Sequence, residues 1–167
     1  MPKEDINAII IIFIDPILPL ISSAANKMCQ LGGAICLADL IKNLQIGNIP
    51  PDFTIKSNYG ADVNLKNTCA NNKYTIIMFW DPTCGHCKEV MPKVAKLYER
   101  NKSKGWKVIT LASGDKKKEW YDYLAKHPEI SEFTNLIRGE VLSQKYADAL
   151  SSYYVIASPT IYLLDEK

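Results

Sequence analysis

Two cysteines separated by two residues stand out in the segment Cys84-Gly85-His86-Cys87. A strongly apolar stretch precedes this segment and an amphipathic helical pattern follows it, so we place the pair at the start of a helix. Side chains three positions apart on a helix lie about 5–6 Å from each other. That separation is within the range that a disulfide accepts between its α-carbons. The pair can therefore close into a disulfide and open again with little movement of the backbone.

The two sulfurs of this pair are expected to differ in reactivity. Cys84 falls in the predicted first turn, where free backbone N–H groups and the helix dipole favour an anion. We therefore expect a lowered pKa at Cys84, which makes it the thiolate that attacks a disulfide. Cys87 lies one turn further along, less exposed, where its thiol can resolve the mixed disulfide. The imidazole of His86, when cationic, favours the thiolate and makes the disulfide more oxidising.

The composition indicates one domain of ordinary size with a modest extension. The 167 residues are 47% hydrophobic and 23% charged, which predicts a real core and excludes disorder as the overall state. The net charge of +2 gives no electrostatic case for nucleic acid, and we interpret the run 116–118 of three lysines as a solvated face. The other cysteines are interpreted as small buried hydrophobes, with their pairing left open. These are Cys29, Cys36 and Cys69.

Strands and helices are expected to alternate after a hairpin. The hairpin is predicted over 53–55 and 63–65, joined through a turn that contains Gly60. Continuous apolar runs predict buried strands, which are 75–80, 108–112 and 160–164. Helical spacing places five side chains on one face of the helix after the cysteines, which Gly105 ends; they are Val90, Met91, Val94, Leu97 and Tyr98. A further helix is expected from about Asp115, with Trp120, Tyr123, Leu124 and His127 on one face. This alternation is typical of a sheet with parallel neighbours and covering helices.

Residues 1–47 are predicted to form a separate, apolar and mostly helical segment. The apolar run 8–14 ends at Asp15-Pro16 and is too short for a membrane helix, which needs about 20 apolar residues. It also lacks the positive charge that precedes a secretory signal. We therefore expect a packed structural segment and no membrane anchoring.

Three motifs in order carry a resemblance to a known family. They are residues 46–55, residues 79–88 with Pro92 in the following helix, and residues 157–165. From about Ile46 to Lys167 the chain resembles the TlpA/ResA-like bacterial thiol-disulfide oxidoreductases of the thioredoxin-like superfamily. The resemblance implies an α/β three-layer sandwich over 48–167. The Gly-His centre between the cysteines is shared with protein disulfide isomerases.

The family resemblance also implies roles for particular residues. Cys84 and Cys87 would be catalytic, with His86, Gly85, Trp80 and Pro159 tuning and supporting the pair. Pro159 would be a cis-proline that faces the cysteines. With Ser158 it would leave backbone groups free to pair with an extended substrate. Pro92 should bend its helix. The implied partners are protein thiols and disulfides, no cofactor is required, and the implied location is the periplasm or cell envelope.

The sequence departs from the family pattern at three places. Met78 stands where thioredoxin buries an acidic residue beneath the cysteines, which puts that proton relay in doubt, and Asp81 in the following loop is expected to be solvated. Thr83 replaces a bulky residue, which should alter substrate contacts. The family fold continues after Leu164 with another strand and a helix, so the fold is expected to be truncated at this end. The strand 160–164 would then have an open edge, which residues 8–14 or a second copy in a homodimer would cover.

Three alternative functions could use the same residues, and a reason stands against each. A metal- or copper-binding module could use the two thiolates and His86, but structural zinc wants four ligands and His127 lies far along the chain. A thiol peroxidase would need a peroxide-activating environment that the sequence does not show. An interaction domain without redox activity is disfavoured because both cysteines are present. The leading prediction is thiol-disulfide exchange.

Overall fold

The computed structural model describes residues 44, 47–57, 60–112, 116–137 and 144–166. Its strands are β1 (Thr54–Lys56), β2 (Asp62–Asn64), β3 (Tyr74–Trp80), β4 (Trp106–Ala112), β5 (Thr134–Ile137) and β6 (Thr160–Asp165). Its helices are α4 (Leu65–Ala70), α5 (Gly85–Asn101), α6 (Lys117–Lys126) and α7 (Gln144–Ser152), with the short 3-10 helices η1 (Lys102–Lys104) and η2 (Pro128–Ile130).

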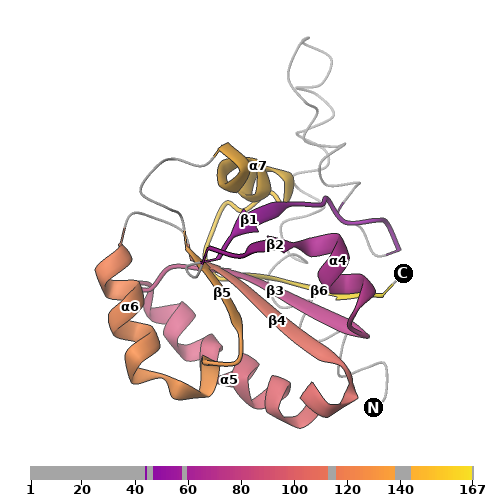
Figure 1. Cartoon of the computed structure of the whole chain (residues 1–167). Coiled ribbons are helices and arrows are strands. Elements are labelled where there is room, and N and C mark those ends of the chain that lie inside the picture. The colour runs from indigo at the N-terminus through magenta and orange to yellow at the C-terminus, as the bar shows by residue number, and fades with distance from the viewer. Residues whose placement is uncertain (1–43, 45–46, 58–59, 113–115, 138–143, 167) are drawn as a thin grey trace, which may run out of the picture.

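The main sheet is mixed, with the strand order β5-β4-β3-β6 (Figure 1). The central strands β3 and β4 run parallel, with Trp80 opposite Ala112. Strand β6 runs antiparallel to β3, with Thr160 opposite Phe79. The end of β3, the end of β4 and the beginning of β6 therefore meet at one edge of the sheet. The two strands β1 and β2 pair separately as an antiparallel hairpin.

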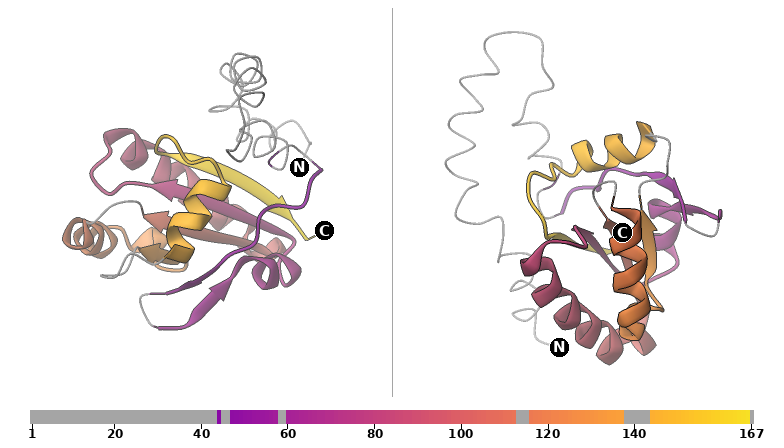
Figure 2. Two further views of the ribbon diagram at one scale, coloured as in Figure 1. Left: turned by 90° about the horizontal axis from the view of Figure 1, so that it is seen from above. Right: turned by 90° about the vertical axis from the view of Figure 1, so that its left-hand side faces the viewer.

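Successive side chains of β3 point to opposite faces of the sheet. Both sets are mostly apolar, and helices cover both faces. Ile76, Met78 and Trp80 join the core cluster that contains side chains of α5 and α6. Ile77 and Phe79 join a second cluster with side chains of the hairpin and α7. Figure 1 and the right-hand view of Figure 2 show α7 on one side of the sheet and α5 with α6 on the other. The arrangement is the expected three-layer α/β sandwich.

Most elements from β1 onward match the sequence-based expectations. The hairpin, the three buried strands and the two helices on either side of β4 are confirmed within a few residues. Helix α5 contains Pro92 and ends at Asn101, and η1 then leads to Gly105. Gly105 has a positive φ of 81°, which explains why glycine occupies this turn into β4. His127 is the C-cap of α6, so the observed helix ends one residue before the last residue of the predicted helical face.

Two α-helices and one strand were not predicted, namely α4, α7 and β5, and neither were the short helices η1 and η2. Conversely, the predictions for the Ile-rich run 8–14, for the helical piece before Gly47 and for Cys29 and Cys36 concern residues outside the described ranges. Within the described ranges, β6 pairs with a strand on one side only, its neighbour being β3. The homodimer through that edge stays a prediction. No described helix combines the length and apolar character that crossing a bilayer requires.

Candidate active site

Cys84 is the N-cap of helix α5, directly after the turn that follows β3. Its backbone is extended, with φ of −71° and ψ of 120°. Its sulfur accepts a hydrogen bond from the backbone N–H of Cys87 at 3.4 Å. A thiolate can therefore take the position of the usual capping oxygen, where the free N–H groups of the first turn meet it. The predicted place of the cysteine pair at a helix start agrees with this geometry.

The environments of the two sulfurs shift their pKa values in opposite directions. The hydrogen bond from the Cys87 backbone, with a smaller one from the Cys87 thiol, lowers the pKa of Cys84, which is partly exposed. Cys87 is completely buried, and this desolvation raises its pKa to about 12. The backbone N–H of Asp81 donates to the Cys87 sulfur at 3.5 Å, which only partly offsets the burial. The outer sulfur is thus the more acidic one.

A cis peptide bond between Ser158 and Pro159 lies against the outer sulfur, as the family resemblance implied. The Cys84 thiol donates to the carbonyl oxygen of Ser158 at 3.6 Å. The sheet explains this proximity, because β6 begins beside the end of β3 and Pro159 precedes β6 directly. Ile156, two residues before Ser158, is 67% exposed and extends the same loop as an apolar surface.

The core cluster that contains Cys87 also contains Met78 and two aromatic side chains, Trp80 and Tyr123. Met78 is completely buried, and the expectation that it replaces the acidic residue of the family stays a prediction. The Trp80 ring is also buried and lies 5.0 Å from the Tyr123 ring of α6. Burial raises the pKa of Tyr123, and the charges of Glu129 and Cys87 add to this. The sequence placed Tyr123 on a packed helical face but gave no sign that it faces Cys87.

Asp81 is less solvated than the sequence led us to expect. Its side chain is only 25% exposed, and Lys116 lies 3.3 Å from its Oδ2. Both the backbone N–H and the hydroxyl of Thr83 donate to its Oδ1, at 2.7 and 2.6 Å. Burial opposes ionisation, but these hydrogen bonds and the lysine lower the pKa of Asp81. Asp81 lies in the short turn that connects β3 to α5, and its carboxylate is partly exposed there.

The two residues between the cysteines are both exposed. Gly85 opens helix α5, and a Cβ added there would meet no atom within 4 Å. His86 has a side chain that is 52% exposed, and its Nδ1 lies 3.3 Å from Glu89 Oε2, three residues further along the helix. The imidazole therefore lies on the solvent side of the pair.

Two other features of the described part bear on alternative functions. Cys69 is a half-buried free thiol whose pKa is raised by burial, and it packs against the cluster on the opposite face of the sheet. No three His, Cys, Asp or Glu side chains of the described ranges gather closely enough to hold a metal ion.

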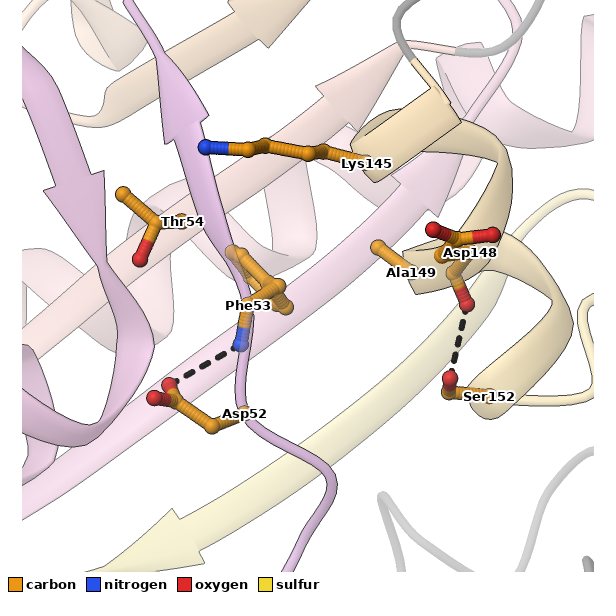
Figure 3. Close-up of a pocket in the computed structure, with 7 residues that line it drawn as sticks. All are labelled: Asp52, Phe53, Thr54, Lys145, Asp148, Ala149 and Ser152. Atoms are coloured by element: carbon orange, nitrogen blue, oxygen red, sulfur yellow. Dashed lines mark hydrogen bonds between the residues drawn. The ribbon is translucent and has the colours of Figure 1, made fainter.

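A shallow pocket lies away from the cysteines, between β1 and α7 (Figure 3). Lys145 extends from α7 across its mouth toward β1, while Asp52 Oδ1 accepts from the N–H of Phe53 at 2.9 Å. None of the predicted site residues lines this pocket. It is formed where the hairpin meets α7, and it is separate from the sulfur site.

Comparisons with known proteins agree with this geometry. A family model described as thioredoxin-like matches residues 71–167. The chain is 24% identical over 121 residues to the sporulation thiol-disulfide oxidoreductase A of Bacillus subtilis, covering 71% of the chain and 67% of that protein. It is 24% identical over 125 residues to the thiol-disulfide oxidoreductase ResA of Bacillus thuringiensis, covering 75% and 66%. The chain thus spans about two thirds of the length of these curated relatives.

A solved structure supports the fold independently. The solution structure of a thiol:disulfide interchange protein from Bacteroides sp. matches with a TM-score of 0.62 at 23% identity. The match covers 74% of this chain and 77% of that one.

Proposed function

The chain belongs to the thioredoxin-like family, and we propose that it is an enzyme of the thiol-disulfide oxidoreductase class. It exchanges electrons with cysteines of other proteins through Cys84 and Cys87, without a cofactor. One observation carries this proposal above the others. A partly exposed sulfur with a lowered pKa and a buried sulfur with a raised pKa lie one helical turn apart at a helix start.

The reaction proceeds in two exchange steps. The Cys84 thiolate attacks one sulfur of a substrate disulfide, which breaks that bond, forms a mixed disulfide and releases a substrate thiolate that takes a proton. The Cys87 thiol then gives up its proton to the departing substrate sulfur and attacks Cys84. The mixed disulfide between Cys84 and the substrate breaks, so the substrate gains two electrons and the cysteine pair is oxidised to a disulfide. The same steps in reverse oxidise a dithiol substrate.

The loop around the cis-proline supports a role in substrate binding. Ser158 and Pro159 lie against the attacking sulfur, and the exposed Ile156 precedes them. An extended substrate segment can pair with the backbone of this loop, in the manner of strand addition. Trp80 is buried in the same core cluster as Cys87 and would support the pair there.

The cellular location and the partners follow from the family resemblance. We infer that the protein acts on protein thiols and disulfides outside the cytoplasmic membrane, as the TlpA/ResA-like relatives named above suggest.

The function is tested by catalysed reduction of a protein disulfide. The protein is added at catalytic concentration to insulin and dithiothreitol, and insulin reduction is followed by its precipitation. Acceleration over the reductant alone, in proportion to the protein added, is the expected result. No acceleration, together with a stoichiometric metal in the purified protein, would favour a metal-binding module.

The unequal sulfurs predict a large difference in alkylation. In a variant with Cys29, Cys36 and Cys69 replaced by serine, iodoacetamide at pH 7 should modify Cys84 more than about 100-fold faster than Cys87. A pKa of about 12 leaves almost no thiolate at Cys87, whereas the pKa of Cys84 lies below that of an ordinary thiol. The rate at Cys84 should fall as the pH falls through its pKa. Peptide mass spectrometry measures both sites, and equal rates would contradict the assignment of Cys84 as the attacking sulfur.

The cation of His86 is proposed to favour the thiolate, so its removal should make the disulfide harder to reduce. His86→Pro leaves the helix intact, because the first turn of α5 tolerates proline, but it also removes the His86 backbone N–H that helps to lower the pKa of Cys84. His86→Gln keeps this N–H and isolates the contribution of the imidazole. The midpoint potential should become more negative by about 30 mV or more, a tenfold change in the equilibrium constant. Equilibration with glutathione buffers measures this potential. His127→Gln, which removes the other histidine, is the control, and an unchanged potential in His86→Pro would refute the tuning role.

A further inference from the structure

Three side chains form a closed ring at the rim of the cysteine site. Lys116 Nζ lies 3.3 Å from Asp81 Oδ2 and donates to Thr83 Oγ1 at 2.5 Å. Thr83 in turn donates to Asp81 Oδ1 through its hydroxyl at 2.6 Å and its backbone N–H at 2.7 Å. The ring joins the turn that carries Cys84 to the residue that precedes α6. These residues are 35 positions apart in the sequence, and the parallel pairing of β3 and β4 brings them together.

The backbone of Asp81 forms hydrogen bonds with both cysteines. Its carbonyl oxygen accepts from the N–H of Cys84 at 3.1 Å, and its own N–H donates to the sulfur of Cys87 at 3.5 Å. Its carboxylate is therefore held close to the redox pair by the shortness of the turn. A negative charge in this place works against the thiolate that the reaction needs.

The electrostatics of the sulfurs agree with this position of the charge. The N–H of Cys87 lowers the pKa of Cys84 most strongly, while the charge of Asp81 acts in the opposite direction. Burial raises the pKa of Cys87 most strongly, and the charge of Asp81 adds to it. The remaining titratable groups around the pair are His86 and Glu89 on α5 and Tyr123 on α6.

We propose that Lys116 is a positioning residue for the redox pair, which acts through Asp81. It holds the carboxylate in the ring with Thr83 and neutralises its charge beside the two sulfurs. The inference rests on the proposed function, because in that function the reaction rate depends on how much of Cys84 is present as thiolate. It assigns a role to one lysine of a run that the sequence presented as an ordinary solvated face.

The test is a double-mutant cycle on the pKa of Cys84, measured by the pH dependence of alkylation in the variant without Cys29, Cys36 and Cys69. Lys116→Gln should raise the pKa by about half a pH unit, the size expected when one partly exposed charge is removed. At a pH below the pKa, alkylation then slows about threefold. Asp81→Asn should lower the pKa by a similar amount, and its Oδ1 can still accept from Thr83. In the Asp81→Asn background, Lys116→Gln should produce less than half of its original shift.

Two variants control the cycle. Lys118→Gln removes the same charge two residues further along the exposed side of α6 and should leave the pKa of Cys84 unchanged. Lys116→Arg keeps the charge and should restore the original value. Thermal unfolding by circular dichroism verifies that each variant is folded. If Lys116→Gln does not fold, the test uses Asp81→Asn alone. A pKa of Cys84 that does not fall in Asp81→Asn then contradicts the inference.

Two other results would overturn the inference. A shift in Lys116→Gln no larger than that in Lys118→Gln would show that the ring does not tune the pair. A shift of at least half its original size in the Asp81→Asn background would show that Lys116 acts on the sulfur without Asp81. Alkylation needs no substrate protein, so these outcomes are distinct from a failure of the proposed function, which appears as absent insulin reduction.

Discussion

Replacing Cys84 by alanine is expected to abolish catalysed disulfide reduction, to less than about 1% of the rate of the unmodified protein. The reason is chemical, because the attacking atom itself is removed. The thiol of Cys87 cannot take over, since it is completely buried and this burial, the largest cause of its raised pKa, remains when Cys84 is removed. The insulin assay measures this loss directly.

The matched control for this loss is Cys69→Ala. Cys69 is also a free cysteine of the described part, but it packs on the opposite face of the sheet and its pKa is raised by burial. This variant should keep the full rate. If Cys84→Ala retained activity while Cys69→Ala lost it, the site would have been placed on the wrong face of the sheet.

Replacing Cys87 by alanine is expected to trap the protein on its substrates. The first exchange still occurs, because the exposed sulfur of Cys84 and its place at the N-terminus of α5 are retained. The second exchange lacks its nucleophile, so the mixed disulfide accumulates and turnover falls to a few per cent or less. Non-reducing electrophoresis after incubation with an oxidised protein should show a covalent complex that dithiothreitol removes.

The double variant Cys84→Ala/Cys87→Ala provides the control for trapping. It should form no complex, because the bond to the substrate is made by Cys84. A complex that persists in the double variant would assign the attacking sulfur to another cysteine. Absence of any complex in Cys87→Ala, with Cys84 still reactive toward iodoacetamide, would contradict the two-step mechanism.

The sequence was most informative where one local pattern determines one structure. The continuous apolar run of β3 could only be buried on both faces, and it is. The position of Cys84 at a helix start followed from the amphipathic pattern after it. The cis-proline came from family resemblance, since no local signal before Pro159 specifies the isomer.

Short elements escaped prediction because their stability comes from tertiary contacts. Helix α4 has six residues, of which Leu65 is buried, and Asn64 caps its start. Helix α7 is different, because Tyr146, Ala149 and Leu150 pack against one core cluster at the i, i+3, i+4 spacing of a helix, a signal that the sequence did offer. Strand β5 has four residues, and it is defined by pairing with β4 rather than by its own alternation.

The ring of Asp81, Thr83 and Lys116 illustrates a different limit. Both charged residues follow the ends of strands, and the carboxyl ends of neighbouring parallel strands meet at one edge of a sheet. Because β3 and β4 are parallel neighbours, this rule predicts that Asp81 and Lys116 lie close together. What the rule does not supply is the direction of each side chain, which depends on the compact turn before Cys84.

The most direct measurement is the state of the two sulfurs after equilibration in glutathione buffers of defined ratio. Acid quenching, alkylation and peptide mass spectrometry then locate each disulfide. We predict that the peptide containing Cys84 and Cys87 loses two hydrogens when the disulfide forms. This change should be reversible, and the oxidised fraction should follow the buffer ratio as a two-electron couple. A peptide that stays reduced at every ratio, or a disulfide that links either sulfur to Cys69 instead, would contradict the account.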